Sequence, residues 1–154
     1  MLSETACQQI QKLISQYPQK RSALIPSLHL VQKELGYISQ DAMAEIARIF
    51  QLSPNEVHEV VSFYTMFYKK PMGKYVIQVC TNISCQLCHA EEIVAHLRKR
   101  LGISFGETSA DRKYSLLEVE RLGSCGTSPV IQINEDYYED LTVEKLDRIL
   151  DGLQ

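Results

Sequence analysis

Four of the five cysteines in this 154-residue chain lie in its second half, at a spacing that limits how that half can fold. They are Cys80, Cys85, Cys88 and Cys125. The first three read C-x4-C-x2-C, and Cys125 follows 37 residues after Cys88. The fourth thiol can join the other three only if the fold returns the chain to the same place. The pattern therefore predicts a second half built around a common thiol site.

Several chemistries compete for these thiols. The spacing matches the plant-type pattern for a [2Fe–2S] cluster, which uses all four cysteines. Zinc also binds thiolates, but structural zinc sites usually pair two C-x2-C motifs, and Cys125 has no such neighbour. Cys85 and Cys88 have i, i+3 spacing near an expected helix start, so both thiols can face one way. A dithiol redox site formed by these two residues would leave Cys80 and Cys125 unused. Four ordinary thiols, or ligation by His89, are further alternatives, and the spacing favours the cluster.

Composition excludes several functional classes. The net charge is −3, and neither half carries the basic stripe that nucleic-acid binding usually needs. No apolar run approaches the ~20 residues of a membrane span, and the N-terminal residues lack the apolar stretch of a signal peptide. We expect a cytoplasmic protein, because clustered cysteines in that compartment more often bind metal than form disulfides.

The first half has the periodicity of a small helical bundle. Apolar residues recur at helical spacing, and serines stand where helices would begin. Ser53 and Glu56 have the spacing of a capping box, with proline at the first helical position. The expected helices cover residues 3–17, residues 20–35 with Pro26 as a kink or first turn, a stretch after Ser39, and a short stretch from Pro54.

An aromatic run at residues 63–68 follows the expected bundle. It suits either the core of the bundle or a surface that contacts a partner. Pro71 and Gly73 come next and indicate a domain boundary. We therefore expect a helical docking domain over residues 1–70 and a second domain over residues 71–154.

The second half alternates strands and helices. Cys80 ends the first expected strand, and Pro129, after the loop of Cys125, is expected to be either cis or in an ordinary trans turn. The order β-α-β-β-α predicts a thioredoxin-like layer with a small mixed sheet, so the chain as a whole is expected to be α+β. The expected strands cover residues 75–79, 115–119, 130–133 and a short stretch from 137; the helices cover 88–101 and a stretch after Thr142.

Across nearly its whole length the chain resembles the peripheral [2Fe–2S] subunit of NADH:quinone oxidoreductase, respiratory complex I. Related subunits occur in NAD-linked hydrogenases and formate dehydrogenases. The stretches that carry the resemblance are residues 20–26, 36–38, 61–64, 73–75, 79–85, 122–130 and 137–142. The resemblance implies an N-terminal helical domain followed by a thioredoxin-like [2Fe–2S] ferredoxin domain.

The same resemblance implies a function and a partner. It implies an electron-transfer subunit of an NADH dehydrogenase complex, placed next to the subunit that binds FMN and NADH. Its cofactor would be a [2Fe–2S] cluster, and the chain would lie in a peripheral arm or soluble complex. The chain would have no catalytic activity alone and no small-molecule substrate, nucleic acid or inserted membrane segment of its own.

One ligand position departs from the family pattern, which is C-x4-C followed by C-x3-C. Cys80, Cys85 and Cys125 match, but the remaining ligand falls on Arg121, and Cys88 stands where the family has a residue that is not a ligand. Cys88 would then be the replacement ligand, so that Cys80, Cys85, Cys88 and Cys125 bind the metal. Two alternatives stay open, namely a cluster-free structural or assembly subunit of the same complex, and a stand-alone thiol oxidoreductase.

Overall fold

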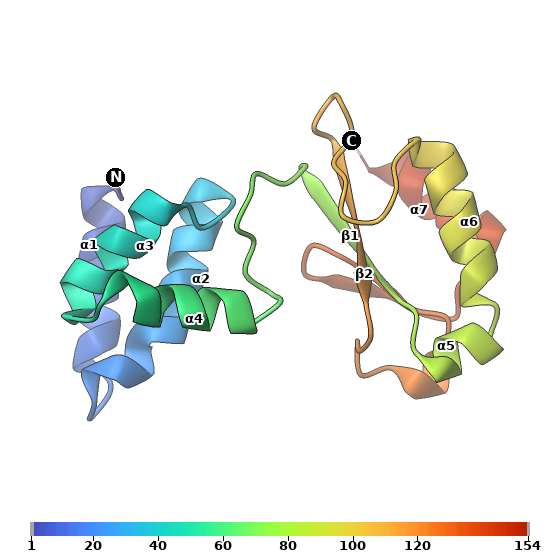
Figure 1. The fold of residues 1–154 in the computed structure, drawn as a ribbon. Coiled ribbons are helices and arrows are strands. Elements are labelled where there is room, and N and C mark those ends of the chain that lie inside the picture. Colours follow the sequence, from blue (N-terminus) through green and yellow to red (C-terminus); the bar gives the residue numbers. More distant parts are fainter. Residues whose placement is uncertain (1, 154) are drawn as a thin grey trace. The chain divides into compact units, whose positions relative to one another are not determined.

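The computed structural model describes residues 2–153, and the chain divides into two compact units, Met1–Pro71 and Met72–Gln154 (Figure 1). The first unit is helical, and the second combines a sheet with helices, which confirms the predicted α+β class. Among the described residues, no helix combines the length and apolarity needed to span a bilayer.

Serine side chains begin three helices of the first unit, as the sequence predicts. Ser3, Ser39 and Ser53 each accept a hydrogen bond from the backbone N–H three residues later, at 3.1, 3.2 and 3.3 Å. At Ser53 the Glu56 carboxylate also accepts from the Ser53 backbone N–H at 2.9 Å, which completes the capping box. The helices of this unit are α1 (Glu4–Ser15), α2 (Leu24–Leu35), α3 (Gln40–Phe50) and α4 (Pro54–Phe63).

The expected helix over residues 20–35 is in fact two elements. A 3₁₀ turn, η1 (Lys20–Ala23), precedes α2, which places Pro26 in the first turn of α2. Proline is tolerated there because the first N–H groups of a helix have no partner inside the helix. Gly36 ends α2 at a φ of +78°, in the left-handed region that glycine adopts without strain.

The aromatic run at residues 63–68 divides between the core and the surface. Phe67 is buried in the apolar core of the bundle, and Tyr64 packs against that core. Phe63, at the end of α4, is 78 % exposed. The Gln32 side chain fixes the run to α2, because it donates to the Met66 carbonyl and accepts from the Tyr68 N–H, at 2.8 and 2.7 Å.

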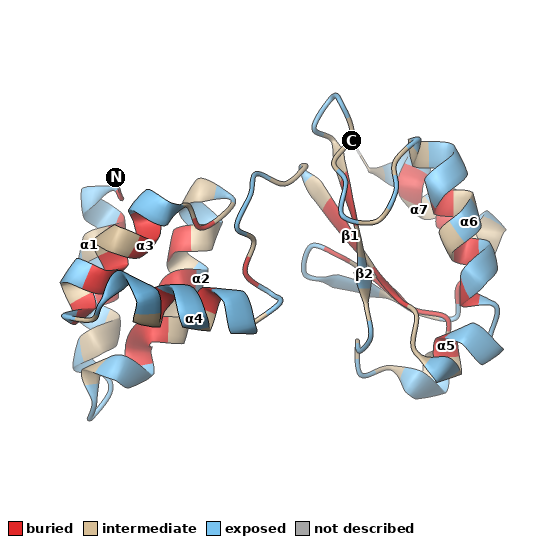
Figure 2. Ribbon diagram, in the orientation of Figure 1, coloured by how far each residue is buried: buried red, intermediate tan, exposed pale blue. Residues whose placement is uncertain are grey.

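A four-stranded mixed sheet organises the second unit. Its order is β2-β1-β3-β4, with β1 parallel to β2 and antiparallel to β3, and with β3 antiparallel to β4. The strands are β1 (Tyr75–Cys80), β2 (Tyr114–Val119), β3 (Ile131–Ile133) and β4 (Asp136–Tyr138). The sheet lies against α6 (Ala90–Leu101) and α7 (Val143–Gly152), whose buried faces are shown in Figure 2.

The connection after β1 differs from the prediction of one helix over residues 88–101. A short helix, α5 (Ile83–Leu87), comes first, and α6 begins only at Ala90. His89 separates them with a φ of +64°, which no helix interior adopts. The chain therefore turns sharply between α5 and α6, and Cys88 lies at that turn rather than at a helix start.

Candidate metal centre

Cys80 and Cys85 lie together at the end of the sheet. Cys80 is the last residue of β1, and Cys85 lies in the middle of α5. The two residues are 4 % and 1 % exposed, and their side chains share a small apolar cluster with Val130. The C-x4-C spacing thus brings two thiols into contact across a strand, a short loop and a helix.

Burial and hydrogen bonding shift the pKa of the Cys80 thiol. Burial raises the pKa of the Cys80 thiol, and a hydrogen bond with the Cys85 thiol raises it further. The backbone N–H groups of Asn82 and Leu122 act in the opposite direction, because they donate to the Cys80 sulfur. The Cys80 thiol therefore loses its proton less readily than an exposed thiol, while N–H donors are already in place to stabilise a thiolate that binds a cation.

Asn82 connects the loop after β1 to the loop that carries Arg121. Its Oδ1 accepts from the Ile83 N–H at 2.7 Å, and so caps α5. Its Nδ2 donates to the Glu120 carbonyl oxygen at 2.8 Å. Sequence analysis does not identify this role. An asparagine directly before a helix signals the cap, but nothing local signals a partner 38 residues away.

Cys125 lies in a second loop, at the start of a 3₁₀ turn, η2 (Cys125–Thr127), with an exposed side chain. Glu139 braces this loop, because its carboxylate accepts from the Thr127 hydroxyl at 2.8 Å. Hydrogen bonds from the Ser124 and Thr127 hydroxyls hold the pKa of the Glu139 carboxyl below its usual value. The Asp140 N–H also donates to the Thr127 carbonyl, at 2.8 Å.

Ser128 links the second loop to the buried pair. Its hydroxyl lies 3.4 Å from the Cys85 sulfur and donates to the Cys125 carbonyl oxygen at 3.1 Å. The Ser128–Pro129 peptide is cis, the first of the two forms expected from the sequence. The contact with Cys85 spans 43 residues, so no local pattern could have revealed it.

Cys88 is placed differently from the expectation that Cys85 and Cys88 would face one way. Its N–H donates to the Ser84 and Cys85 carbonyls, at 3.2 and 3.1 Å, but its side chain is exposed whereas Cys85 is buried. The i, i+3 argument fails because α5 ends at Leu87. His89 is also exposed, and its Nδ1 lies 3.5 Å from a Glu92 carboxylate oxygen at the surface.

Within residues 2–153, no three Cys, His, Asp or Glu side chains gather closely enough to hold a metal ion. The structure brings the Cys80 and Cys85 thiols together and places the second loop beside them. The thiols of Cys88 and Cys125 remain at the surface. Two adjacent thiols with N–H donors suit one iron of a cluster. Cys88 directly follows α5, and Cys125 begins η2 in the second loop.

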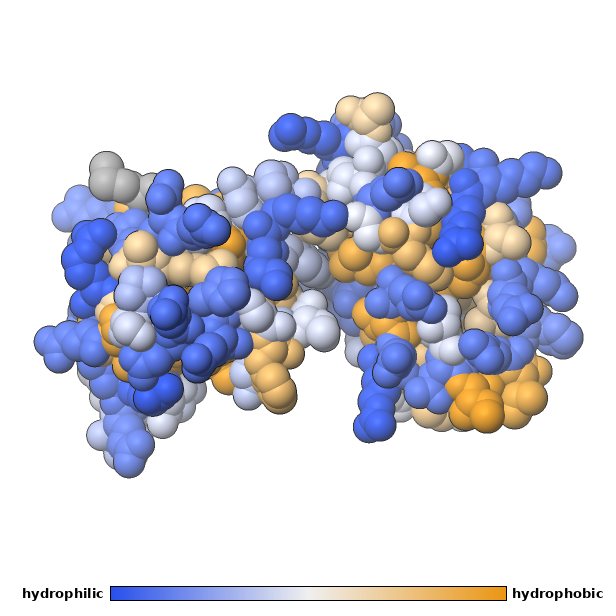
Figure 3. Space-filling view, viewed as in Figure 1, coloured by the Kyte–Doolittle hydropathy of each residue, from blue (hydrophilic) through white to orange (hydrophobic). Residues whose placement is uncertain are grey.

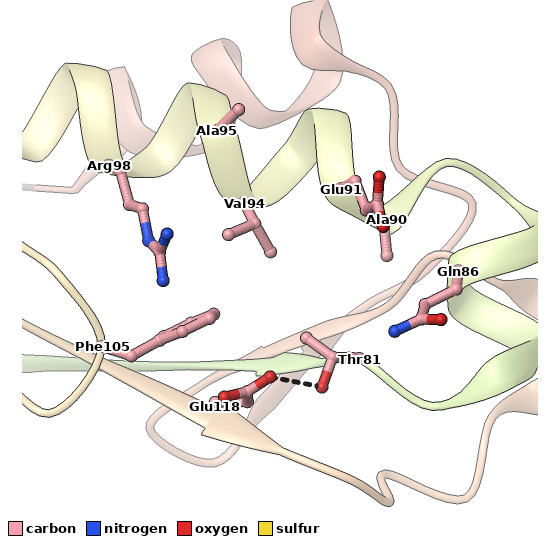
Figure 4. A pocket seen from close by; sticks show the side chains of 9 residues that line it. All are labelled: Thr81, Gln86, Ala90, Glu91, Val94, Ala95, Arg98, Phe105 and Glu118. Atoms are coloured by element: carbon pink, nitrogen blue, oxygen red, sulfur yellow. Dashed lines mark hydrogen bonds between the residues drawn. The ribbon is translucent and has the colours of Figure 1, made fainter.

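A groove of about 320 Å³ lies between α6 and the edge strand β2 (Figure 4). Val94 and Phe105 form much of its apolar lining, and the Arg98 guanidinium lies 4.7 Å from the centre of the Phe105 ring. Near Thr81 the groove is polar, since the Thr81 hydroxyl donates to Glu118 at 2.9 Å. No cysteine lines this groove, so it is separate from the thiol site.

Residues 10–154 match the family described as thioredoxin-like [2Fe-2S] ferredoxin. The chain is 37 % identical over 150 residues to a subunit of the NADH-quinone oxidoreductase of Rhizobium meliloti (strain 1021), covering 97 % of this chain and 89 % of that protein. It is 43 % identical over 145 residues to an NADH-quinone oxidoreductase subunit of Rickettsia bellii (strain RML369-C), covering 92 % and 87 %.

A solved structure supports the same fold. The NAD+-reducing [NiFe]-hydrogenase in the air-oxidized state matches with a TM-score of 0.75 at 24 % identity, covering 85 % of this chain. This chain corresponds to only 22 % of that hydrogenase chain, so the likeness concerns the fold alone. The family match and the relatives together show that this chain is a member of the thioredoxin-like [2Fe-2S] ferredoxin family.

Proposed function

We propose that this chain is a peripheral electron-transfer subunit of an NADH-oxidising complex, and that it carries a [2Fe–2S] cluster. The observation that carries the proposal is the contact between the Cys80 and Cys85 thiols, with the Asn82 and Leu122 N–H groups directed at the Cys80 sulfur. Relatives of similar length are named as subunits of NADH-quinone oxidoreductase, which supports the same role. When bound, the cluster supplies a one-electron acceptor.

Cys80, Cys85 and Cys125 are the first three proposed ligands, and Cys88 is the fourth. Cys7 belongs to the other unit, so Cys88 is the remaining thiol of the second unit. It stands three residues from Cys85, at the turn where α5 ends and α6 has not begun.

The proposed partner is a subunit that binds FMN and NADH. Exposed apolar side chains support docking on both units. Phe63 is exposed at the end of α4, while Ile83 and Leu87 are 69 % and 77 % exposed on α5. Ile83 and Leu87 are four residues apart, so they lie on one face of α5, where Figure 3 shows hydrophobic surface. Such a pair beside the thiol site suits a protein contact.

A second candidate is a structural or assembly subunit without a cluster. Two observations favour it: Arg121 occupies a family ligand position, and no three metal-ligating side chains gather within the described residues 2–153. This subunit would keep the docking surfaces and lose electron transfer. The two candidates differ in what the purified chain binds rather than in how it folds.

Anaerobic reconstitution with iron and sulfide separates the candidates. A brown protein with about two iron per chain and an electron paramagnetic resonance signal after reduction supports the electron-transfer role. A colourless, iron-free protein that still binds its partner supports the structural role. A colourless protein that reduces disulfides would instead indicate the thiol oxidoreductase.

A further inference from the structure

The Ser128 hydroxyl stands between the two loops that carry the proposed ligands. Its oxygen lies 3.4 Å from the Cys85 sulfur on one side and 3.1 Å from the Cys125 carbonyl oxygen on the other. Cys85 belongs to α5, and Cys125 begins η2. One hydroxyl therefore touches a ligand sulfur of one loop and the backbone of a ligand residue in the other.

The number of protons available decides which bonds this hydroxyl can make. A serine hydroxyl has one proton to donate, and a carbonyl oxygen can only accept. In the metal-free chain the hydroxyl donates to the Cys125 carbonyl, so the Cys85 S–H must supply the proton shared with Ser128. All three groups are then satisfied without conflict.

Ligation of iron removes that S–H proton, because cysteine binds metal as the thiolate. The Ser128 hydroxyl then lies between two acceptors and can donate to only one of them. A hydrogen bond to a charged sulfur is stronger than one to a neutral carbonyl. In the iron-bound chain the hydroxyl would therefore turn to the Cys85 sulfur and leave the Cys125 carbonyl.

We propose that Ser128 is a positioning residue that donates a hydrogen bond to the Cys85 ligand sulfur and thereby raises the reduction potential of the bound cluster. The proposal rests on the proposed electron-transfer role. Hydrogen bonds to ligand sulfurs are among the factors that set the potential of iron–sulfur clusters. A donor at the sulfur withdraws negative charge and stabilises the reduced form, which carries one more electron.

The rest of the second loop does not depend on Ser128. The Thr127 hydroxyl donates to Glu139, and the Thr127 carbonyl accepts from the Asp140 N–H, both at 2.8 Å. The Leu141 N–H also donates to the Pro129 carbonyl, at 3.2 Å. These bonds hold the loop while the hydroxyl changes partner, so removal of the hydroxyl is expected to leave the loop in place.

The test measures the reduction potential of the reconstituted full chain by titration monitored with electron paramagnetic resonance. Ser128→Ala removes the donor, and Ser128→Thr keeps a hydroxyl at the same position. Ser84→Ala is the matched control, because Ser84 lies next to Cys85 in the sequence and its hydroxyl has no hydrogen-bond partner in the described part of the chain. Circular dichroism and iron analysis accompany each variant.

Ser128→Ala is expected to lower the potential at unchanged iron content, while Ser128→Thr and Ser84→Ala stay at the wild-type value. If Ser128→Ala fails to fold or to load, Ser128→Gly removes the same hydroxyl: a potential below that of wild type supports the proposal, and a potential equal to that of wild type overturns it. If every protein binds iron and Ser128→Ala has the same potential as wild type, this inference is overturned and the proposed function is not. Absence of iron in the wild-type chain overturns the proposed function and this inference together.

Discussion

A hydrogen bond between Asn82 and Glu120 joins the loop after β1 to the loop that carries Arg121. The Asn82 Nδ2 donates to the Glu120 carbonyl oxygen at 2.8 Å. Glu120 directly precedes Arg121, the position at which the resemblance implies a ligand. The Oδ1 atom of the same side chain caps α5. One residue thus orients the helix of Cys85 and the loop of Arg121 together.

Replacement of Asn82 separates these two roles. Asn82→Ala removes the cap and the bridge, and is expected to lower the free energy of unfolding by about 1–2 kcal/mol. Asn82→Asp keeps a capping oxygen and loses only the donor to Glu120, so a smaller loss is expected. Urea unfolding followed by circular dichroism measures both. Equal losses in the two variants would show that the cap contributes nothing, and an Asn82→Asp variant as stable as wild type would show that the bridge contributes nothing.

Arg121 is expected to raise the potential of the cluster. An all-thiolate [2Fe–2S] centre carries about two negative charges when oxidised and about three when reduced, so a nearby cation favours the reduced form. Arg121→Cys should therefore lower the potential and strengthen iron retention. Arg121→Gln is the control, since it removes the charge without adding a thiol, and should lower the potential alone. A potential in the arginine form that is equal to or below that of Arg121→Cys would contradict this.

Glu139 should make the second loop sensitive to acid. Its pKa is lowered in the folded chain by hydrogen bonds from Ser124 and Thr127, so its contribution to stability is present above the ordinary glutamate pKa of about 4.3. That contribution is lost as the pH falls below this value through the lower folded pKa. Stability measured by urea unfolding between neutral and acidic pH is expected to fall less steeply in Glu139→Gln than in wild type.

The control for Glu139→Gln is Glu135→Gln, which removes an exposed carboxylate in the turn between β3 and β4. It should leave the acid dependence as in wild type. If both glutamine variants lose the same share of the acid dependence, general charge rather than the loop contact with Glu139 accounts for the effect.

Two phenylalanines four residues apart test the docking surface of the first unit. Phe63→Ala should weaken binding to the flavin subunit at unchanged stability, because Phe63 is 78 % exposed. Phe67→Ala should lower the free energy of unfolding by about 3–5 kcal/mol, because Phe67 is buried in the core. Co-purification with the partner and thermal unfolding measure the two effects. Partner binding by Phe63→Ala as tight as wild type would remove this surface from the proposal.

Local sequence signals predicted the parts of the fold that local interactions determine. The Ser53 and Glu56 capping box marked α4, and Cys80 was correctly placed at a strand end. Gly73 was interpreted as a boundary signal, but a side chain there would also come within 2.7 Å of the Tyr114 backbone. That close approach depends on tertiary packing that no local pattern contains.

The division between α5 and α6 is a feature of the site that the sequence pattern does not predict. His89 adopts a left-handed conformation that is uncommon for residues other than glycine, and nothing in its neighbourhood signals it. The resulting turn exposes Cys88, which helical spacing had aligned with Cys85. The contacts of Asn82 and Ser128 were missed for the same reason, since their partners lie 38 and 43 residues away.

The central claim is that this chain holds a [2Fe–2S] cluster with Cys88 in place of the ligand missing at Arg121. Iron content and visible absorbance of the reconstituted wild-type chain and its Cys88→Ser variant test it most directly. The account predicts about two iron per chain in the wild type and loss of colour and iron in Cys88→Ser. A Cys88→Ser protein with the iron content and spectrum of the wild type would contradict it.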